Sequence, residues 1–279
     1  MGFCIYCGKK LEDGEVCNCR EEKQEVSMQQ MNAQYNSQQF EQVKEQSAKV
    51  LSETLGAFIA ILKAPVSAGR QIAGMGSMKL GIGLFSIQAI ISGILAMIFC
   101  GQINDLLYSL TSAVGSFVDG PDEIKMNIFT CFLLTVIGSL AISFALALVL
   151  FLLVKIFKAN TTYAHMVSVV GVRSVGTTSI IVLAILLYFI KEPLGIAVYV
   201  FSGILGLLFM VRVIPSASSL SEDRVAYVTI LATVLGIVIF YVVMRILLPL
   251  YVPDEFIEFL DGIIEVLENP LSLLDSFYM

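Results

Sequence analysis

Between residues 127 and 154 the sequence reads NIFTCFLLTVIGSLAISFALALVLFLLV, a run that contains no Asp, Glu, Lys or Arg. A hydrocarbon layer about 30 Å thick is crossed by roughly 20 helical residues, so this run is expected to form a transmembrane helix. Four further apolar runs, which contain no Asp or Glu, cover residues 80–103, 176–190, 194–212 and 225–248. Lys191-Glu192-Pro193 separates the third and fourth of the five runs, which predicts a tight helical hairpin there. The sequence therefore predicts an all-α polytopic membrane protein with five transmembrane helices in a membrane domain at 80–250.

The overall composition supports the same class of protein. Of the 279 residues 57 % are hydrophobic and only 14 % are charged, and the mean hydropathy is +0.85. A soluble domain of this length needs a charged surface that this chain lacks. The N-terminus is polar and shows no cleavable signal peptide, so we expect the first span to act as an uncleaved anchor.

The distribution of basic residues predicts the orientation. If all five runs span, fourteen of the 17 Lys and Arg residues fall on one side, and only Lys125, Lys191 and Arg245 on the other. Basic residues are enriched in cytoplasmic loops. We therefore expect a multi-pass protein of the plasma membrane with a cytoplasmic N-terminus and an extracellular C-terminus.

Residues 1–20 form a cysteine module. Cys4 and Cys7 make a Cys-x-x-Cys pair, Cys17 and Cys19 make a Cys-x-Cys pair, and nine residues lie between the two pairs. Cytosolic thiols stay reduced, and four thiolates supply the tetrahedral shell of a structural Zn²⁺. A redox Cys-x-x-Cys is the alternative, but that motif normally sits in a larger βαβ domain. A fragment this small needs a metal to fold, so the module is predicted to be a zinc ribbon with no catalytic role.

Three further segments flank the predicted membrane domain. Residues 21–42 are rich in Gln, Asn, Glu and Lys, which is typical of a flexible tether. A juxtamembrane amphipathic helix is predicted within 43–79, lying on the membrane surface and ending near Pro65, because helix is disfavoured before proline. The alternative is a packed helix of a soluble stalk.

The C-terminal segment 251–279 is predicted to be an external, acidic amphipathic helix. Its apolar face would consist of Phe256, Phe259, Leu260, Ile263, Ile264 and Leu267. Because the opposite face is acidic and anionic lipid would repel it, we expect the helix to dock near residues 105–120 of its own bundle. Docking on a partner protein is the alternative.

Other polar residues provide little evidence of catalysis. His165 is the only histidine and is expected on the surface of a basic loop, while Cys100 and Cys131 are expected to be ordinary packing residues. The predicted spans contain no carboxylate of the kind that marks ion pathways, and their polar exceptions are Gln88 and Arg245. Gln88 is expected to hydrogen-bond to another helix. We predict no enzymatic activity, no catalytic residue and no cofactor-binding residue other than the zinc ligands.

Two resemblances extend this interpretation. The stretch from Cys4 to Gly14, CIYCGKKLEDG, resembles short zinc ribbons that begin many uncharacterised membrane proteins of Gram-positive bacteria. The membrane part, from about residue 60 to 250, resembles the Yip (Ypt-interacting protein) family, through LKAP at 62–65, KANTTYAH at 158–165 and VVGV at 169–172. The proline expected near the third span is replaced by Val175-Gly176-Thr177. The resemblance implies five closely packed spans, a cytoplasmic N-terminus and a role in membrane trafficking or shaping.

From these features we expect a non-enzymatic scaffold or regulator of a bacterial membrane. The zinc ribbon would recruit or sense a cytoplasmic protein, and the lipid-embedded part could also assemble with copies of itself. Nucleic acid is not expected as a partner. The alternatives are an envelope stress sensor and a small transporter or permease-like component, for which a substrate-sized polar cavity among the spans would be the favouring observation.

The zinc assignment predicts that a peptide of residues 1–25 binds one Zn²⁺ at sub-micromolar free metal. Replacing one ligand, as in Cys7→Ser, should weaken binding strongly, because three thiolates leave the coordination shell incomplete. Metal content after dialysis measures both peptides. A wild-type peptide that retains no zinc would rule out the four-cysteine site.

Overall fold

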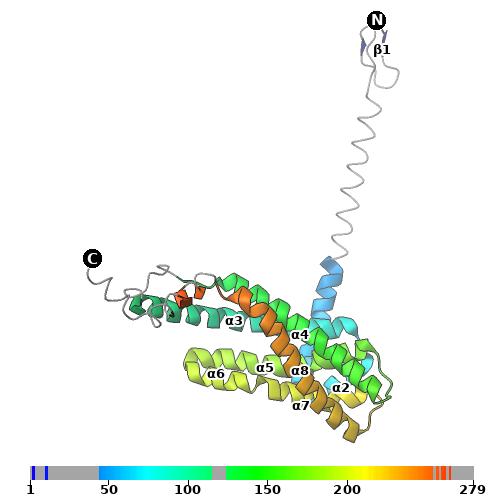
Figure 1. Cartoon of the computed structure of the whole chain (residues 1–279). Coiled ribbons are helices and arrows are strands. Elements are labelled where there is room, and N and C mark those ends of the chain that lie inside the picture. The colour runs from blue at the N-terminus through cyan, green and yellow to red at the C-terminus, as the bar shows by residue number, and fades with distance from the viewer. Residues whose placement is uncertain are drawn as a thin grey trace, which may run out of the picture. The chain divides into compact units, whose positions relative to one another are not determined.

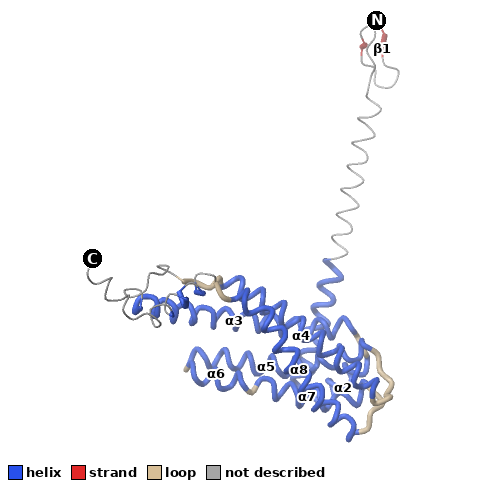
Figure 2. The backbone as a smooth tube through the Cα atoms, in the orientation of Figure 1, coloured by secondary structure: helices blue, strands red, loops and turns tan. Residues whose placement is uncertain are grey.

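The computed structural model describes residues 2–3, 10–11, 44–114, 124–253, 256–257, 259–261 and 264. Within them, five helical segments are long and apolar enough to cross a membrane, as the sequence predicted. They are α3 (Met78–Val114), α4 (Ile128–Ile156), α5 (Tyr163–Ile190), α6 (Glu192–Val200) together with α7 (Ser202–Ala217), and α8 (Glu222–Tyr251). Figures 1 and 2 show them as one bundle of long helices joined by short connections, in which α8 crosses the others obliquely.

Within residues 1–20 the structure describes a short antiparallel pair of strands. Strand β1 (Gly2–Phe3) pairs with β2 (Lys10–Leu11), with Gly2 opposite Leu11 and Phe3 opposite Lys10. In sequence, this pair brackets the Cys-x-x-Cys motif. The predicted ligands Cys4, Cys7, Cys17 and Cys19 and the predicted tether at 21–42 lie outside the described residues.

The juxtamembrane region contains two helices where the sequence analysis predicted one. Residues 44–63 are helical and the helix ends before Pro65, as expected. The chain then forms α2 (Pro65–Met75), which packs against α5 and α7. Helix α2 ends at Gly76, whose φ of 59° is readily adopted by glycine. A Cβ at Gly76 would also lie 2.7 Å from the ring of His165, so this turn requires glycine on two counts.

The predicted start of the third span is wrong by thirteen residues. Helix α5 begins at Tyr163 and not at residue 176, and the stretch predicted to be a basic loop is largely helical. Thr162 caps the helix, because its hydroxyl accepts a hydrogen bond from the backbone N–H of His165 at 3.4 Å. From residue 166 to 178 every residue except Arg173 is buried, so packing against the bundle stabilises a segment whose composition is only moderately apolar.

The first span also differs from its prediction. Helix α3 continues to Val114 instead of ending near residue 103. Leu106, Leu107 and Leu110, which lie beyond the predicted end of this span, continue the helix with three- and four-residue spacing. The hairpin between the third and fourth spans forms as expected: α5 ends at Ile190, Lys191 is extended, and α6 begins at Glu192.

The C-terminal helix docks where it was predicted to dock, but by a narrower face. Residues 256–257, 259–261 and 264 are helical. Phe259 is 3 % exposed and forms a cluster with Leu107 and Ile124, with Phe256 packed against it. Leu260 and Ile264, which were expected on the buried face, are 41 % and 50 % exposed. Ile263 and Leu267 lie outside the described residues, so the packing of this helix is described at Phe256 and Phe259.

This packing predicts a difference between neighbouring positions. Phe259→Ala should lower the stability of the detergent-solubilised protein by about 3 kcal/mol, at the low end for a buried Phe because the cluster is small. Leu260→Ala is the matched control and should change stability by less than about 0.5 kcal/mol, as is usual for exposed positions. Thermal melting in one detergent compares the two variants. Equal melting temperatures would contradict the docked helix.

A candidate ligand cavity among the membrane helices

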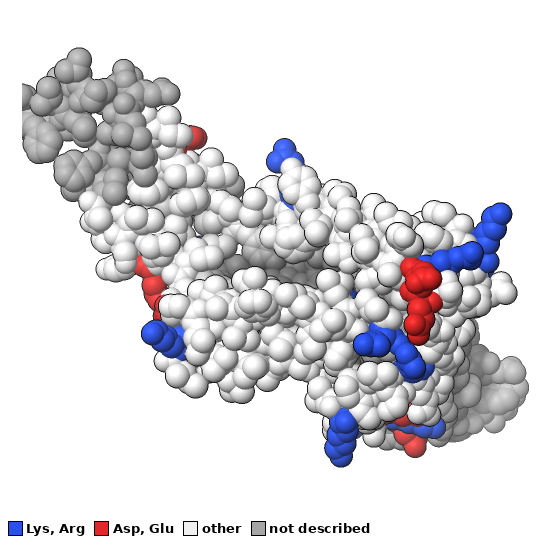
Figure 3. Space-filling model, turned by 90° about the horizontal axis from the view of Figure 1, so that it is seen from below, with Lys and Arg blue, Asp and Glu red and all other residues white. Residues whose placement is uncertain are grey.

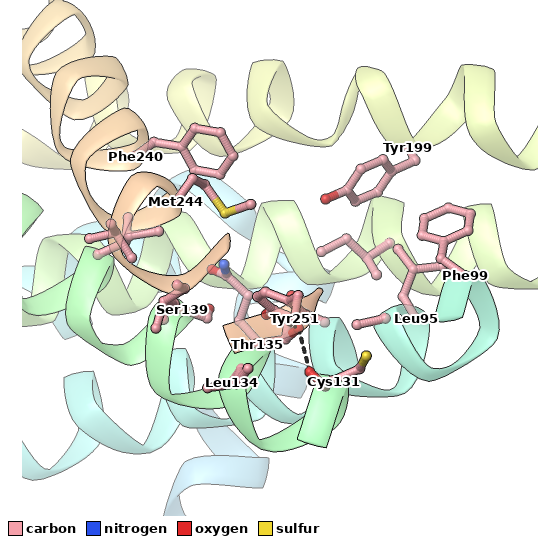
Figure 4. Close-up of a pocket in the computed structure, with 18 of the residues that line it drawn as sticks. Leu95, Phe99, Cys131, Leu134, Thr135, Ser139, Tyr199, Phe240, Met244 and Tyr251 are labelled. Carbon is pink, nitrogen blue, oxygen red and sulfur yellow. Dashed lines mark hydrogen bonds between the residues drawn. The ribbon is translucent and has the colours of Figure 1, made fainter. Parts of the chain in front are cut away.

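A cavity of about 530 Å³ lies within the membrane domain, where α3, α4, α5, α6, α7 and α8 meet. Its volume is in the range of small-molecule sites, roughly 300–1,000 Å³. Figure 4 shows Phe240 and Met244 reaching toward it from α8, Tyr199 from α6, and Leu95 and Phe99 from α3. Most of the wall is therefore apolar or aromatic.

One end of the cavity is polar. The lining residues Gln88, Ser139, Ser143, Arg173 and Thr177, here called the arginine end, come from α3, α4 and α5. Helices α3 and α5 run parallel, since Gly81 lies against Val167 and the Phe99 ring lies 5.9 Å from the Tyr188 ring. This register places Gln88 beside the turn of α5 that holds Arg173 and Thr177.

Two of the three hydroxyl groups of the arginine end are already used within their own helices. Ser143 donates to the carbonyl of Ser139 at 2.8 Å, and Thr177 donates to that of Arg173 at 3.4 Å. Three buried polar atoms have no hydrogen-bond partner among the described residues, and two of them, Oε1 of Gln88 and Nε of Arg173, belong to residues that line the cavity; the third is Oγ1 of Thr54. The expectation that Gln88 hydrogen-bonds another helix is therefore not met at its oxygen. Buried polar groups are rarely left unpaired in proteins, so these two atoms mark the cavity.

Arg173 has no acidic partner in its surroundings. The five predicted spans contain no Asp or Glu, and among the described residues no carboxylate forms an ion pair with this guanidinium. The stem of Arg173 passes Gly206 of α7, where a Cβ would lie 3.3 Å from its Cγ. The Nε is inaccessible, while the accessible remainder of the side chain lines the cavity.

The opposite end of the cavity, here called the tyrosine end, is held by hydrogen bonds. Thr135 donates its single hydroxyl hydrogen to the carbonyl of Cys131 at 2.8 Å, so it must accept from the Tyr251 hydroxyl, also at 2.8 Å (Figure 4). On α3, the Asn104 amide forms two bonds with the backbone of Met126, at 3.0 and 2.8 Å. These contacts join α8 to α4, and the segment before α4 to α3.

The structure places the other predicted residues as follows. Among the described residues no group of three or more His, Cys, Asp or Glu could hold a metal. The four N-terminal cysteines lie outside the described residues. His165 is half-buried in the first turn of α5 and bonds to the Thr162 hydroxyl at 2.6 Å, so the prediction of a surface loop histidine is wrong. Cys100 and Cys131 are buried as expected, but their Sγ atoms lie 3.0 Å apart.

Arg173 is the residue that the sequence analysis missed. It was counted among the basic loop residues that orient the protein, whereas it lies inside α5. Its signal was local: in VVGVRSVGTTS it is the only charged residue among small and apolar ones. Such a setting is typical of a buried helix, in which an ionisable residue has a functional partner more often than on a surface.

Comparison of the chain with protein-family models, with curated proteins and with solved structures finds no match. The resemblance to the Yip family therefore stays a prediction from the sequence.

The cysteine pair provides a test of the α3–α4 register. In a variant with Cys4, Cys7, Cys17 and Cys19 replaced by Ser, copper–phenanthroline and oxygen should oxidise Cys100 and Cys131 to a disulfide. The reaction removes two hydrogen atoms, which pass to oxygen, and intact-protein mass spectrometry measures the loss. Adjacent thiols on two packed helices are near bonding distance, so the reaction should be intramolecular. Cys131→Ser is the control, and failure of the unsubstituted pair to oxidise after detergent solubilisation would contradict the register.

Proposed function

We propose that this chain is a non-enzymatic, multi-pass membrane protein whose membrane domain binds a small amphipathic molecule in the cavity. The supporting observation is the combination of an apolar space of about 530 Å³ with two unpaired polar atoms at one end. Ligand sites are mostly apolar and contain a few convergent polar groups, and this cavity has both features. The transporter-like alternative called for a polar cavity among the spans, whereas this cavity is mainly apolar and polar at one end, which favours an amphipathic ligand.

Binding is favoured over ion-coupled transport. Proton- and ion-coupled carriers use Asp, Glu or His within their spans, whereas the carboxylates of the five described spans, Asp105, Glu192, Glu222 and Asp223, do not line the cavity. In the described structure the lone histidine, His165, lies in the first turn of α5 and does not line the cavity. A receptor or a carrier of an amphiphile needs none of these groups.

The surface offers a route from the lipid. In Figure 3 most of the middle of the drawn face carries no Lys, Arg, Asp or Glu, and this face is hollowed between the helices. Several exposed side chains on α6, α7 and α8 are large and apolar, among them Val200, Leu208 and Tyr241. An amphiphile dissolved in the bilayer would reach the cavity without passing through water.

A second role is favoured by the N-terminal cysteines. We propose that Cys4, Cys7, Cys17 and Cys19 hold a structural Zn²⁺ and that this module recruits a cytoplasmic partner. The pairing of β1 with β2 on either side of the Cys-x-x-Cys motif supports this proposal.

In the proposed orientation the cysteine module lies in the cytoplasm and the C-terminus lies outside the cell. Reporter fusions at residues 40 and 279 should therefore report opposite sides of the membrane. A cytoplasmic C-terminus would exclude this orientation.

The cavity function predicts a specific effect of filling the space. Gly203 lines the cavity, and a Cβ there meets no atom within 4 Å, so Gly203→Leu places a side chain in open space. In native mass spectrometry of the full chain in a neutral detergent, the wild type should bind one molecule of hexadecanol or palmitate. Gly203→Leu should bind at least about tenfold less, the loss expected from about 1.4 kcal/mol of excluded contact.

Gly101→Leu is the matched control. Gly101 also has open space around its Cβ position but does not line the cavity, so this variant should bind as the wild type does. If the wild type binds neither probe, or if both variants lose binding equally, the cavity is not a ligand site.

A further inference from the structure

We propose that the cavity takes an anionic single-chain amphiphile, whose carboxylate or phosphate head group pairs with Arg173 and whose chain lies along the apolar wall. This inference rests on the proposed function and adds the chemical class of the ligand.

The charge of Arg173 is the first argument. A guanidinium group remains protonated in proteins, so this side chain brings a positive charge into the bundle. Its Nε is buried with no partner among the described residues, and the predicted spans have no carboxylate to neutralise it. A buried charge needs both an opposite charge and hydrogen bonds. An anionic oxygen that enters the cavity would supply both.

The geometry of the arginine end is the second argument. The guanidinium is a planar donor that matches carboxylate and phosphate oxygens. Close packing against Gly206 of α7 restrains the Arg173 stem, and Thr177 occupies the next turn of the same helix. Gln88 adds an unpaired acceptor at the same level of the bundle. A head group that has a hydroxyl beside its anionic oxygens would bring a counter-charge to the accessible part of the guanidinium and a hydrogen-bond donor to the level of Gln88.

The length of the cavity is the third argument. Fifteen residues of α5 separate Arg173 from Tyr188, which corresponds to about 22 Å of helix. At the Tyr188 level the Phe99 ring lies 5.9 Å from Tyr188 and 6.2 Å from Tyr199. Both Phe99 and Tyr199 line the cavity. The acyl chains of one leaflet occupy about 15 Å, half of the hydrocarbon thickness, so one extended chain fits between the arginine end and these rings.

The test compares matched pairs of amphiphiles that differ in charge. Palmitate is compared with hexadecanol, and 1-palmitoyl lysophosphatidic acid with 1-palmitoylglycerol, by native mass spectrometry of the full chain in a neutral detergent. The wild type should bind each anion at least about tenfold more tightly than its neutral counterpart, because a hydrogen bond to a charged partner contributes at least one decade of affinity. Tighter binding of the lysophosphatidic acid than of palmitate would identify the hydroxyl-bearing phosphate as the preferred head group.

The variants assign the preference to one residue. Arg173→Gln should remove the preference for anions, so that palmitate and hexadecanol bind with similar affinity, and Arg173→Lys should keep part of the preference. Arg245→Gln is the matched control, since Arg245 also lies in a span but is exposed and does not line the cavity. Gel filtration and thermal melting verify that each variant folds.

The possible results are distinct. Equal binding of anionic and neutral probes by the wild type would overturn the inference while leaving the cavity as a ligand site. Binding of no probe at all would overturn the proposed function itself. If Arg173→Gln does not fold, the wild type and Arg173→Lys test the inference instead. A preference for anions in the wild type that is smaller in Arg173→Lys supports the inference, and equal binding of anionic and neutral probes overturns it. A preference that survives in a folded Arg173→Gln would overturn the role of Arg173.

Discussion

The bundle depends on the close approach of α3 and α5 at Gly81 and Gly171. A Cβ at Gly81 would lie 2.7 Å from the Val167 carbonyl oxygen, and one at Gly171 would lie 2.8 Å from the Cα of Gly81. Lipid chains are as apolar as leucine, so helices in a membrane associate through such close packing. Around this contact α2 and α7 cover α5 further, and a Cβ at Gly69 would lie 3.0 Å from both Val172 and Val213.

The same packing explains why a cavity exists. Near Gly81 the helices touch through backbone, whereas toward the tyrosine end the contacts are between large rings such as Phe99 and Tyr199. Helix α8 also packs closely at one end only: its buried residues all lie in its first half, and they are Val225, Val228, Thr229 and Ala232. Its second half contributes Phe240 and Met244 to the cavity wall. The space is a consequence of tight packing at one end and bulky side chains at the other.

Sequence alone predicted the features that depend on one segment at a time. The apolar runs, the break before Pro65 and the hairpin at Lys191 follow from length, composition and local backbone preference. The start of α5 did not, since residues 163–175 are helical through burial against α2, α3 and α7 and not through hydropathy. Phe259 was predicted to be buried and is, but the exposure of Leu260 depends on how the helix is rotated against Leu107. The cavity depends on several helices together, so no single segment indicates it.

The contrast between Arg173 and Arg245 explains why only the first points to a ligand. Arg245 lies six residues before the end of α8 and is exposed, so its long side chain can extend to the membrane–water interface. Arg173 lies ten residues from one end of α5 and seventeen from the other, with buried residues on both sides. Its stem is held against Gly206, and its Nε is sealed from solvent. Because this arginine lies far from both ends of its helix and lines the cavity, the proposed anion would come to the arginine through that cavity.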